Sequence, residues 1–382
     1  MEIRYCIKCV IPNTKPDIFF DHDGICSGCK SFDSRAKVDW IAREAEFVEL
    51  ADEFRAGNGE WDCVIGVSGG KDSLYQVLRA KEYGFNPLCV TSTTCDFTEI
   101  GKRNLSAIKE LGVDHIQFSA NPVVRRKLNR IGLEQVGDIA WPEHVGIFTI
   151  PVRVALQYGI KLIIWGENSQ NEYGGPESAA ASKNLNRSWL EEFGGLLGMR
   201  TADLTDVFGF KPSEVHAYEY PSAKSLENAG ITGVFLGHYF QWDGLANSLI
   251  ATAHGFESYG QAAEGSYLNF ENLDNYHHGI HDYFKFLKYG FGRTTDQISL
   301  QIRRGRMSRN QGIEIVMKRD GRFPWSYLGK NIQEILEPLE INLDQFISIC
   351  DQFTNNEIFL KNTDGSFKKD RKQNLTLVKQ VQ

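Results

Sequence analysis

The six residues from Ser68 to Ser73, Ser-Gly-Gly-Lys-Asp-Ser, have the types and the order needed to hold a phosphate group. Two adjacent glycines let the backbone turn tightly and bring its N–H groups against a ligand. An apolar run before them predicts a buried strand over Cys63–Val67, and a helix is predicted over 73–83. The N-terminus of that helix offers unpaired donors and a positive dipole, and Lys71 adds charge. The alternative is an ordinary turn before a helix.

This string lacks the spacing of a Walker A loop, but after a strand it resembles the PP-loop of the N-type ATP pyrophosphatases. Those enzymes split ATP into AMP and pyrophosphate. The resemblance implies ATP and Mg²⁺ as cofactors, with catalytic roles for Lys71 and Asp72. Lys71 would stabilise charge on the pyrophosphate, and Asp72 would position the helix start or Mg²⁺. The nucleotide-binding residues are then Ser68, Gly69, Gly70, Lys71, Asp72 and Ser73.

Four of the eight cysteines form two Cys-x2-Cys pairs whose separation is typical of a zinc site, namely Cys6, Cys9, Cys26 and Cys29. Four thiolates close a tetrahedral structural site with no open position. About thirty residues bury little core, so a metal would hold this module together. Four free thiols and an iron–sulfur cluster are the alternatives.

The chain predicts an α/β fold with a doubly wound parallel sheet, because strand-like and helix-like runs alternate between Trp61 and about Tyr239. Strands are expected at Cys63–Val67, Leu88–Thr91, His115–Ser119, Lys161–Trp165 and Gly233–Gly237, with helices at 73–83, 100–111, 122–131 and 144–158. The predicted organisation is a zinc-ribbon-like module (1–35), a connecting helix (36–60), a PP-loop domain of the adenine nucleotide alpha hydrolase-like type (61–240) and a mainly helical substrate- or partner-binding region (241–382).

Ligands of such sheets bind at the carboxyl ends of the strands, which singles out residues that follow them. Gly166, Glu167 and Glu172 follow the strand Lys161–Trp165, and Thr91 ends the second strand. The glycine permits close approach to a nucleotide, and carboxylates near phosphates can hold Mg²⁺. An ordinary polar loop is the alternative for each of them.

The C-terminal region carries candidate substrate-binding residues. Lys288 and Arg293 flank a turn with two glycines and suit a phosphate or a carboxylate, so both are also candidate catalytic residues. The histidines His278 and His281 favour a pocket or core role, because no nearby residue completes a metal site. An arginine cluster, read either as a solvated face or as phosphate contacts, contributes Arg303, Arg304 and Arg306.

Composition and charge limit the class of protein. The 382 residues have a formal net charge of −7, which argues weakly against a protein that coats nucleic acid. No apolar run approaches the roughly 18 residues of a membrane span, and no secretory h-region follows the first methionine. We therefore expect a cytoplasmic protein without membrane insertion.

Within the PP-loop group, the whole pattern resembles the N-acetyl sugar amidotransferases, which install acetamidino groups on surface-polysaccharide and flagellar sugars. The resemblance rests on the cysteine pairs, SGGKDS, GENSQNE at 166–172, GHYFQWD at 237–243, HGIHDY at 278–283, KYGFGR at 288–293 and IRRGRMSR at 302–309. It implies an N-acetylated acidic sugar or nucleotide sugar as substrate. It also implies two partners, a separate glutaminase subunit and an ammonia-channelling, cyclase-like subunit.

Residue 2 is Glu and no Gly-x-Cys-x-Gly elbow occurs, so ammonia is expected from elsewhere. The first rival function is a PP-loop tRNA sulfur transferase, for which Cys95 is the only plausible persulfide-forming residue. The second rival is a non-catalytic nucleotide-binding or zinc-ribbon interaction protein.

Overall fold

A five-stranded parallel sheet lies at the centre of the computed structural model, which describes residues 2–55, 60–175 and 197–382. Its strands are β1 (Cys63–Gly66), β2 (Pro87–Ser92), β3 (Asp114–Phe118), β4 (Leu162–Trp165) and β5 (Thr232–Phe235). They lie in the order β3-β2-β1-β4-β5 and all pair in parallel. The order reverses between β1 and β4, which confirms the predicted doubly wound sheet and places its switch point there.

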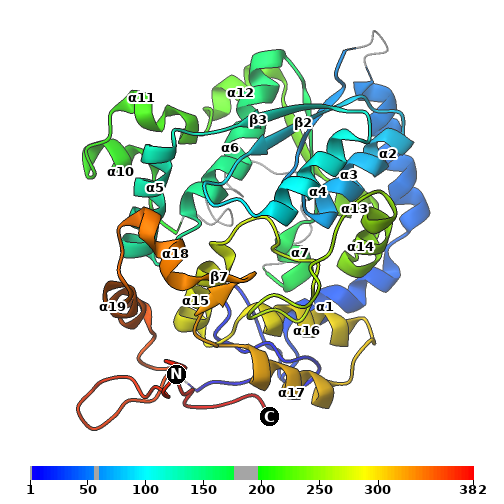
Figure 1. The fold of residues 1–382 in the computed structure, drawn as a ribbon. Helices are drawn as coiled ribbons and strands as arrows, with labels where there is room; N and C mark the ends of the chain where they lie inside the picture. Colours follow the sequence, from blue (N-terminus) through cyan, green and yellow to red (C-terminus); the bar gives the residue numbers. More distant parts are fainter. Residues whose placement is uncertain (1, 56–59, 176–196) are drawn as a thin grey trace.

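Both faces of the sheet are covered, because successive residues of each strand point to opposite sides. On β1, Cys63 and Ile65 face one apolar core, whereas Val64 faces the other. The first face carries α3 (Lys71–Glu82), α4 (Glu99–Lys109) and α2 (Trp40–Phe54). The second carries α6 (Trp141–Tyr158) and α12 (Ala223–Ala229), as Figure 1 shows. The predicted strands and the helices between them are confirmed, with ends that shift by one to three residues.

The C-terminal region is mainly helical and continues the first core rather than forming a separate one. Apolar residues from Phe47 and Leu74 to Phe346 and Phe359 belong to the same buried cluster. The region contains α14 (Gly244–Ala253), α15 (His278–Tyr289), α16 (Arg293–Arg303), α17 (Arg309–Arg319), α18 (Ile332–Leu336), α19 (Leu343–Phe353) and the small hairpin β6 (Ser326–Tyr327) with β7 (Lys330–Asn331). Helix α2, the α/β part of the chain and this region therefore share one core.

Shorter helices complete the described part of the chain. They are α1 (Ser27–Ser34) beside the cysteines, α5 (Pro122–Ile131), α7 (Ser169–Tyr173), α10 (Thr201–Asp206), α11 (Pro212–Val215) and α13 (Leu236–Tyr239). Among the helices of the described ranges, none is long and apolar enough to cross a membrane.

The last fifteen residues differ from their sequence pattern, which is basic and polar and predicts a frayed tail from Lys368 onward. Instead, Lys369 bridges Leu375, Leu377 bridges Phe359, and Val381 is buried. The two ends of the chain lie on the same side of the molecule, since the Tyr5 hydroxyl donates to the Lys379 carbonyl at 3.1 Å (Figure 1).

Helix α2 was predicted as a connecting helix, but it also packs into the core. Mutation can test whether α2 is part of the core or only a linker. We expect Phe47→Ala to lower the free energy of unfolding by about 3–5 kcal/mol. The Phe47 ring is fully buried, and its centroid lies 5.1–5.8 Å from those of four other aromatic rings. The control Ile41→Ala lies on the same helix with 83% of its surface exposed and should cost less than about 0.5 kcal/mol. Equal costs in urea unfolding would show that α2 is only a linker.

Candidate active site

The loop between β1 and α3 has the geometry of an anion cradle. Gly70 is the N-cap of α3 and supplies no side-chain cap, so the first-turn N–H groups of the helix remain open to a ligand. The Ser73 hydroxyl accepts the Ser68 N–H at 3.0 Å, and the Ser68 hydroxyl accepts the Gly70 N–H at 3.3 Å. These bonds fix the loop in shape before any ligand binds.

Gly69 is required for two independent reasons. Its φ of +87° lies in the left-handed region, which favours glycine. In addition, a Cβ at this position would lie 2.9 Å from the backbone nitrogen of Leu105 on α4. The loop therefore lies directly against α4, and no other residue type fits without movement of that helix.

Gly166 and Glu167 lie on the other side of the switch point, directly after β4. The Gly166 carbonyl accepts the Gly237 N–H at 3.1 Å, which ties this turn to the end of β5. Glu167 then faces the same cavity as the β1–α3 loop. The β1–α3 loop and the turn after β4 therefore lie at the same edge of the sheet, as predicted.

A cavity of about 190 Å³ lies over the loop, and all six residues from Ser68 to Ser73 line it. Its opposite wall comes from the C-terminal region, including Phe270, Glu271 and Arg293. Helix α4 holds this wall in place, since Asn104 exchanges hydrogen bonds of 3.0 and 2.7 Å with the Glu257 backbone. The cavity is therefore closed only when both parts of the chain are folded together.

The residues that line this cavity include more carboxylates than cations. The Lys71 ammonium lies 2.7 Å from Asp72 and 3.5 Å from Glu271, and although burial opposes its charge, these carboxylates raise the pKa of Lys71. Burial first and Asp72 second raise the pKa of Glu167 to about 7. Two cations face four lining carboxylates, so a polyphosphate would need further positive charge. Asp72 and Glu167 offer the oxygen donors that Mg²⁺ takes.

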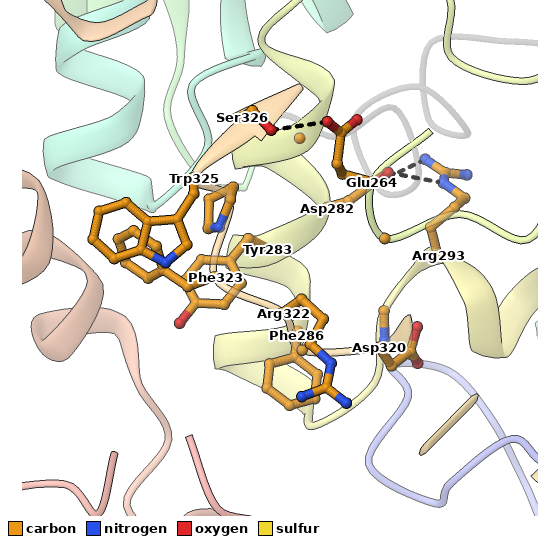
Figure 2. A pocket seen from close by; sticks show the side chains of 15 residues that line it. Glu264, Asp282, Tyr283, Phe286, Arg293, Asp320, Arg322, Phe323, Trp325 and Ser326 are labelled. Atoms are coloured by element: carbon orange, nitrogen blue, oxygen red, sulfur yellow. Dashed lines mark hydrogen bonds and ion pairs between the residues drawn. The ribbon is translucent and has the colours of Figure 1, made fainter. Parts of the chain in front are cut away.

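A second cavity of about 240 Å³ meets the first at Arg293, which lines both. Figure 2 shows its two sides: the rings of Tyr283, Phe323 and Trp325 lie together on one, and the ion pair of Asp282 with Arg293 lies on the other. Nε and Nη2 of Arg293 donate to the two Asp282 oxygens at 3.3 and 3.0 Å. Burial opposes ionisation of Asp282, but Arg293 lowers its pKa to about 2.

Asp320 provides an acceptor at the wall of this second cavity. Its Oδ2 accepts the Gly292 N–H at 2.8 Å and the Thr295 hydroxyl at 2.5 Å, whereas its buried Oδ1 has no hydrogen-bond partner among the described residues. Burial raises the pKa of Asp320 to about 6. The arrangement of an aromatic side, an ion pair and a carboxylate suits a polar ring-shaped ligand with hydroxyl groups.

Several residues predicted from the sequence lie outside both cavities. The Thr91 hydroxyl donates to the Val67 carbonyl at 2.6 Å, so it supports the loop from behind. Lys288 donates to the Val136 carbonyl at 2.6 Å, and His278 lies 3.1 Å from Asp274. His281 contacts Asp138 at 2.7 Å. Of the four predicted catalytic residues, the structure brings Lys71, Asp72 and Arg293 together and leaves Lys288 apart.

The arginine cluster and Glu172 tie parts of the chain together instead of lining either cavity. Glu172 is buried and pairs with Arg35 at 2.6 Å and with Arg304 at 3.1 Å. Arg306 donates to Asp243 at 3.0 Å. This network joins the N-terminal module, the α7 segment and α16. The Arg303 side chain reaches the cysteine cluster through Nη2 and also donates from Nη1 to the Glu172 carbonyl at 3.0 Å.

The four N-terminal cysteines are buried and could hold one zinc ion. The Sγ atoms of Cys6 and Cys29 lie 3.9 Å apart, and those of Cys9 and Cys26 lie 3.7 Å apart. Thiolates at the corners of a tetrahedron around zinc stand about 3.8 Å apart. All four lie within 4.8 Å of one another, which favours a single ion, since thiolates of a multi-iron cluster bind different irons and stand further apart. Arg303 Nη2 lies 3.7 Å from Cys26 Sγ and offsets the thiolate charge.

The sequence analysis missed several cavity residues. Glu271 and Phe270 lie in a stretch without helical or strand periodicity, so no pattern indicated them. Asp282 is part of the quoted HGIHDY motif, but only its histidines were selected. Asn104 lies within the helix predicted over 100–111 and was not selected. Two sequence signals could have indicated them. One is an asparagine inside a predicted helix, and the other is an acidic residue next to the selected histidines.

Comparison with known families identifies the C-terminal region. Residues 257–375 match the family described as "LPS biosynthesis protein WbpG-like, C-terminal domain". The match covers about a third of the chain and includes Glu264, Asp282 and Arg293 of the second cavity. It supports the resemblance to the N-acetyl sugar amidotransferases that the sequence motifs suggest.

No curated protein matches the chain. Among solved structures, one titled "Structure of NMN synthetase from Francisella tularensis" is similar at 20% sequence identity, over 50% of this chain and 92% of that chain. Its TM-score is 0.28, a value too low to carry an argument about this protein.

The two constraints on Gly69 can be separated by mutation. Gly69→Ala should lower the free energy of unfolding by about 1–2 kcal/mol because of its backbone conformation. The contact of the new Cβ with α4 should lower it by about 1–3 kcal/mol more. At the control position Gly230, φ is +65° and no atom lies within 4 Å of an added Cβ. Gly230→Ala should therefore show only the backbone cost of about 1–2 kcal/mol. Urea unfolding of both variants measures the difference, and equal losses would mean that the loop moves freely away from α4.

The contact of Arg303 with the cysteines also has a measurable consequence. Arg303→Gln should lower zinc affinity about 10- to 100-fold, because the charge beside the thiolates is removed. The control Arg306→Gln removes an arginine of the same cluster that pairs with Asp243. Competition with a chromogenic chelator measures both affinities. If the two variants released zinc equally, Arg303 would have no role at the metal.

Proposed function

Because its residues 257–375 match the C-terminal domain of WbpG-like lipopolysaccharide biosynthesis proteins, we propose that this chain is an ATP-dependent sugar amidotransferase. It converts an N-acetyl group of a sugar to an acetamidino group through an adenylated intermediate, and it releases AMP and pyrophosphate. The observation that carries the proposal is the meeting of two cavities at Arg293: one lies over the anion cradle, and the other lies in the matched domain.

The chemistry needs both cavities because an amide carbon is a poor electrophile and its oxygen a poor leaving group. Attack of the acetamido oxygen on the α-phosphate of ATP forms a new P–O bond and breaks the bond to pyrophosphate. Ammonia then adds to the activated carbon, and AMP leaves with the former amide oxygen. The amidine retains the sugar's nitrogen, and the protons released pass to solvent.

Residues of the first cavity serve the pyrophosphate. The open N–H groups at the start of α3 and the Lys71 ammonium face the charge that develops there. Mg²⁺, held by Asp72 and Glu167, would supply the further positive charge that this carboxylate-rich cavity needs. Asn247 fixes Asp72 by donating to its Oδ1 at 2.9 Å.

Residues of the second cavity serve the sugar. The exposed face of Trp325, 39% of whose surface is accessible, and the neighbouring ring of Phe323 at 4.6 Å offer an apolar surface for a sugar ring. Arg293 lies between this surface and the cradle, so a carboxylate or phosphate of an acidic acceptor would meet it at the junction. The acidic acceptor thus relies on Arg293 rather than on Lys288 or the arginine cluster.

The two partners are proposed from the family resemblance, and the cytoplasmic location is proposed from the sequence features described above. Ammonia would come from a separate glutaminase through the channelling subunit. The zinc ion has a structural role, because four thiolates leave no open position and Arg303 covers two of them.

The tRNA sulfur transferase is the less favoured function. That function would need Cys95 to form the persulfide. Cys95 instead hydrogen-bonds to Asn129 and does not line the cavity over the loop. A purely nucleotide-binding protein would not need the second cavity.

The test incubates the full chain with ATP, Mg²⁺, ammonium and a panel of neutral and acidic nucleotide-linked N-acetyl sugars. Mass analysis should find an acetamidino sugar with AMP and pyrophosphate, and glutamine should not replace ammonium. Lys71→Met should lower turnover by about 10²–10³-fold. AMP formation that requires tRNA and not sugar would contradict the proposal.

One substitution separates the roles of the two cavities. Trp325→Ala should raise the KM for the sugar by about two- to tenfold and leave the KM for ATP unchanged, since the ring lies only in the second cavity. The control Trp61→Ala changes an aromatic residue packed on Tyr158, away from both cavities. If Trp325→Ala changed only the KM for ATP, the assignment of the cavities would be wrong.

A further inference from the structure

Three side chains that the proposed function does not use meet between the start of α6 and α15, namely Asp138, His144 and His281. We call them the Asp138 cluster. Asp138 precedes α6, His144 lies in the first turns of α6, and His281 lies on α15. No local pattern around His281 indicates a ligand set, because its partners lie more than a hundred positions earlier in the chain.

The backbone fixes the position of the carboxylate. A π-helical turn, Gly132–Val136, follows α5 and ends at Gly137, whose φ is +61°. The Asp138 N–H then donates to the Gly132 carbonyl at 2.9 Å, and its Oδ1 accepts the Ala140 N–H at 2.9 Å. Such π-helical turns are rare and occur often at functional sites.

The donor atoms of the cluster lie close together, at or slightly below the separations of ligands around one ion. Nδ1 of His281 lies 2.7 Å from Oδ1 of Asp138, and Nδ1 of His144 lies 3.0 Å from Oδ2. All three ligand atoms lie within 4.8 Å of one another. Nitrogen and oxygen ligands at about 2.0–2.2 Å from a metal stand about 3–3.5 Å apart. The buried Nδ1 of His144 makes no aligned hydrogen bond, although the carboxylate is near.

We propose that Asp138, His144 and His281 bind one divalent transition-metal ion, in a site distinct from the four cysteines. Two imidazoles and one carboxylate suit Zn²⁺, Fe²⁺ or a similar ion, and three protein ligands leave at least one position open for water or an oxygen ligand. The carboxylate is 4% exposed, whereas the His144 and His281 side chains are 29% and 24% exposed. An ion can therefore reach the site from solvent.

His281 is followed directly by Asp282, the partner of Arg293, but none of the three cluster residues lines either cavity. The inference stands apart from the proposed function, since it concerns metal binding alone. Its alternative is a metal-free trio in which one carboxylate accepts hydrogen bonds from both imidazoles.

Metal analysis of the full chain distinguishes the two. After loading with Zn²⁺ and dialysis, wild type should retain about two equivalents, one at the cysteines and one at the cluster. His144→Gln and His281→Gln should each retain about one. The control His278→Gln lies one turn before His281, is similarly exposed at 22% and has its own carboxylate partner in Asp274, so it should retain two. Circular dichroism checks that each variant is folded.

Cobalt gives a second, spectroscopic readout. Co²⁺ at the cysteines produces intense thiolate charge-transfer bands, whereas Co²⁺ at the cluster adds only weak d–d bands. Titration of the metal-free chain should therefore show two phases, and the second should be missing in His281→Gln. A single zinc equivalent in wild type with one cobalt phase, or equal metal content in His281→Gln and His278→Gln, would overturn the proposal.

Discussion

The ion pair of Arg293 with Asp282 is the contact on which the candidate active site depends. Both side chains are largely buried, and Asp282 engages Nε and Nη2 of the guanidinium, which leaves Nη1 outside the pair. Burying either charge alone would be costly, so the pair fixes both partners in place. The arginine is thereby held where the two cavities meet, at the first residue of α16. A shift of this pair would separate the anion cradle from the aromatic surface.

The shared core explains why the C-terminal region can complete a site that begins in the α/β domain. Helix α4 lies against the β1–α3 loop at Gly69 and holds the Glu257 backbone through Asn104. The wall at Phe270 and Glu271 is therefore positioned by the same helix as the loop. On the far side, Glu172 joins the cysteine module to α16 through Arg35 and Arg304. Stability of the N-terminal module and geometry of the site are coupled through α16.

Sequence periodicity was sufficient for the sheet and the cradle, because strands buried on both faces appear as apolar runs and the loop has local spacing. It was insufficient for charged residues, whose partners are distant in sequence. Arg303 and Arg306 looked alike, yet one faces thiolates and the other Asp243. The basic tail looked unstructured, but it pairs with residues near 360, which no local pattern could show. His281 appeared to lack a ligand set for the same reason.

The central claim is that the acetamido oxygen of the sugar attacks ATP. An acceptor labelled with ¹⁸O at its N-acetyl carbonyl, incubated with the chain, ATP and ammonium, tests this directly. The account predicts that the heavy oxygen appears in AMP, because the P–O bond formed in the first step is retained when AMP leaves. Recovery of the label in pyrophosphate or water, or its retention in the sugar while AMP accumulates, would contradict it.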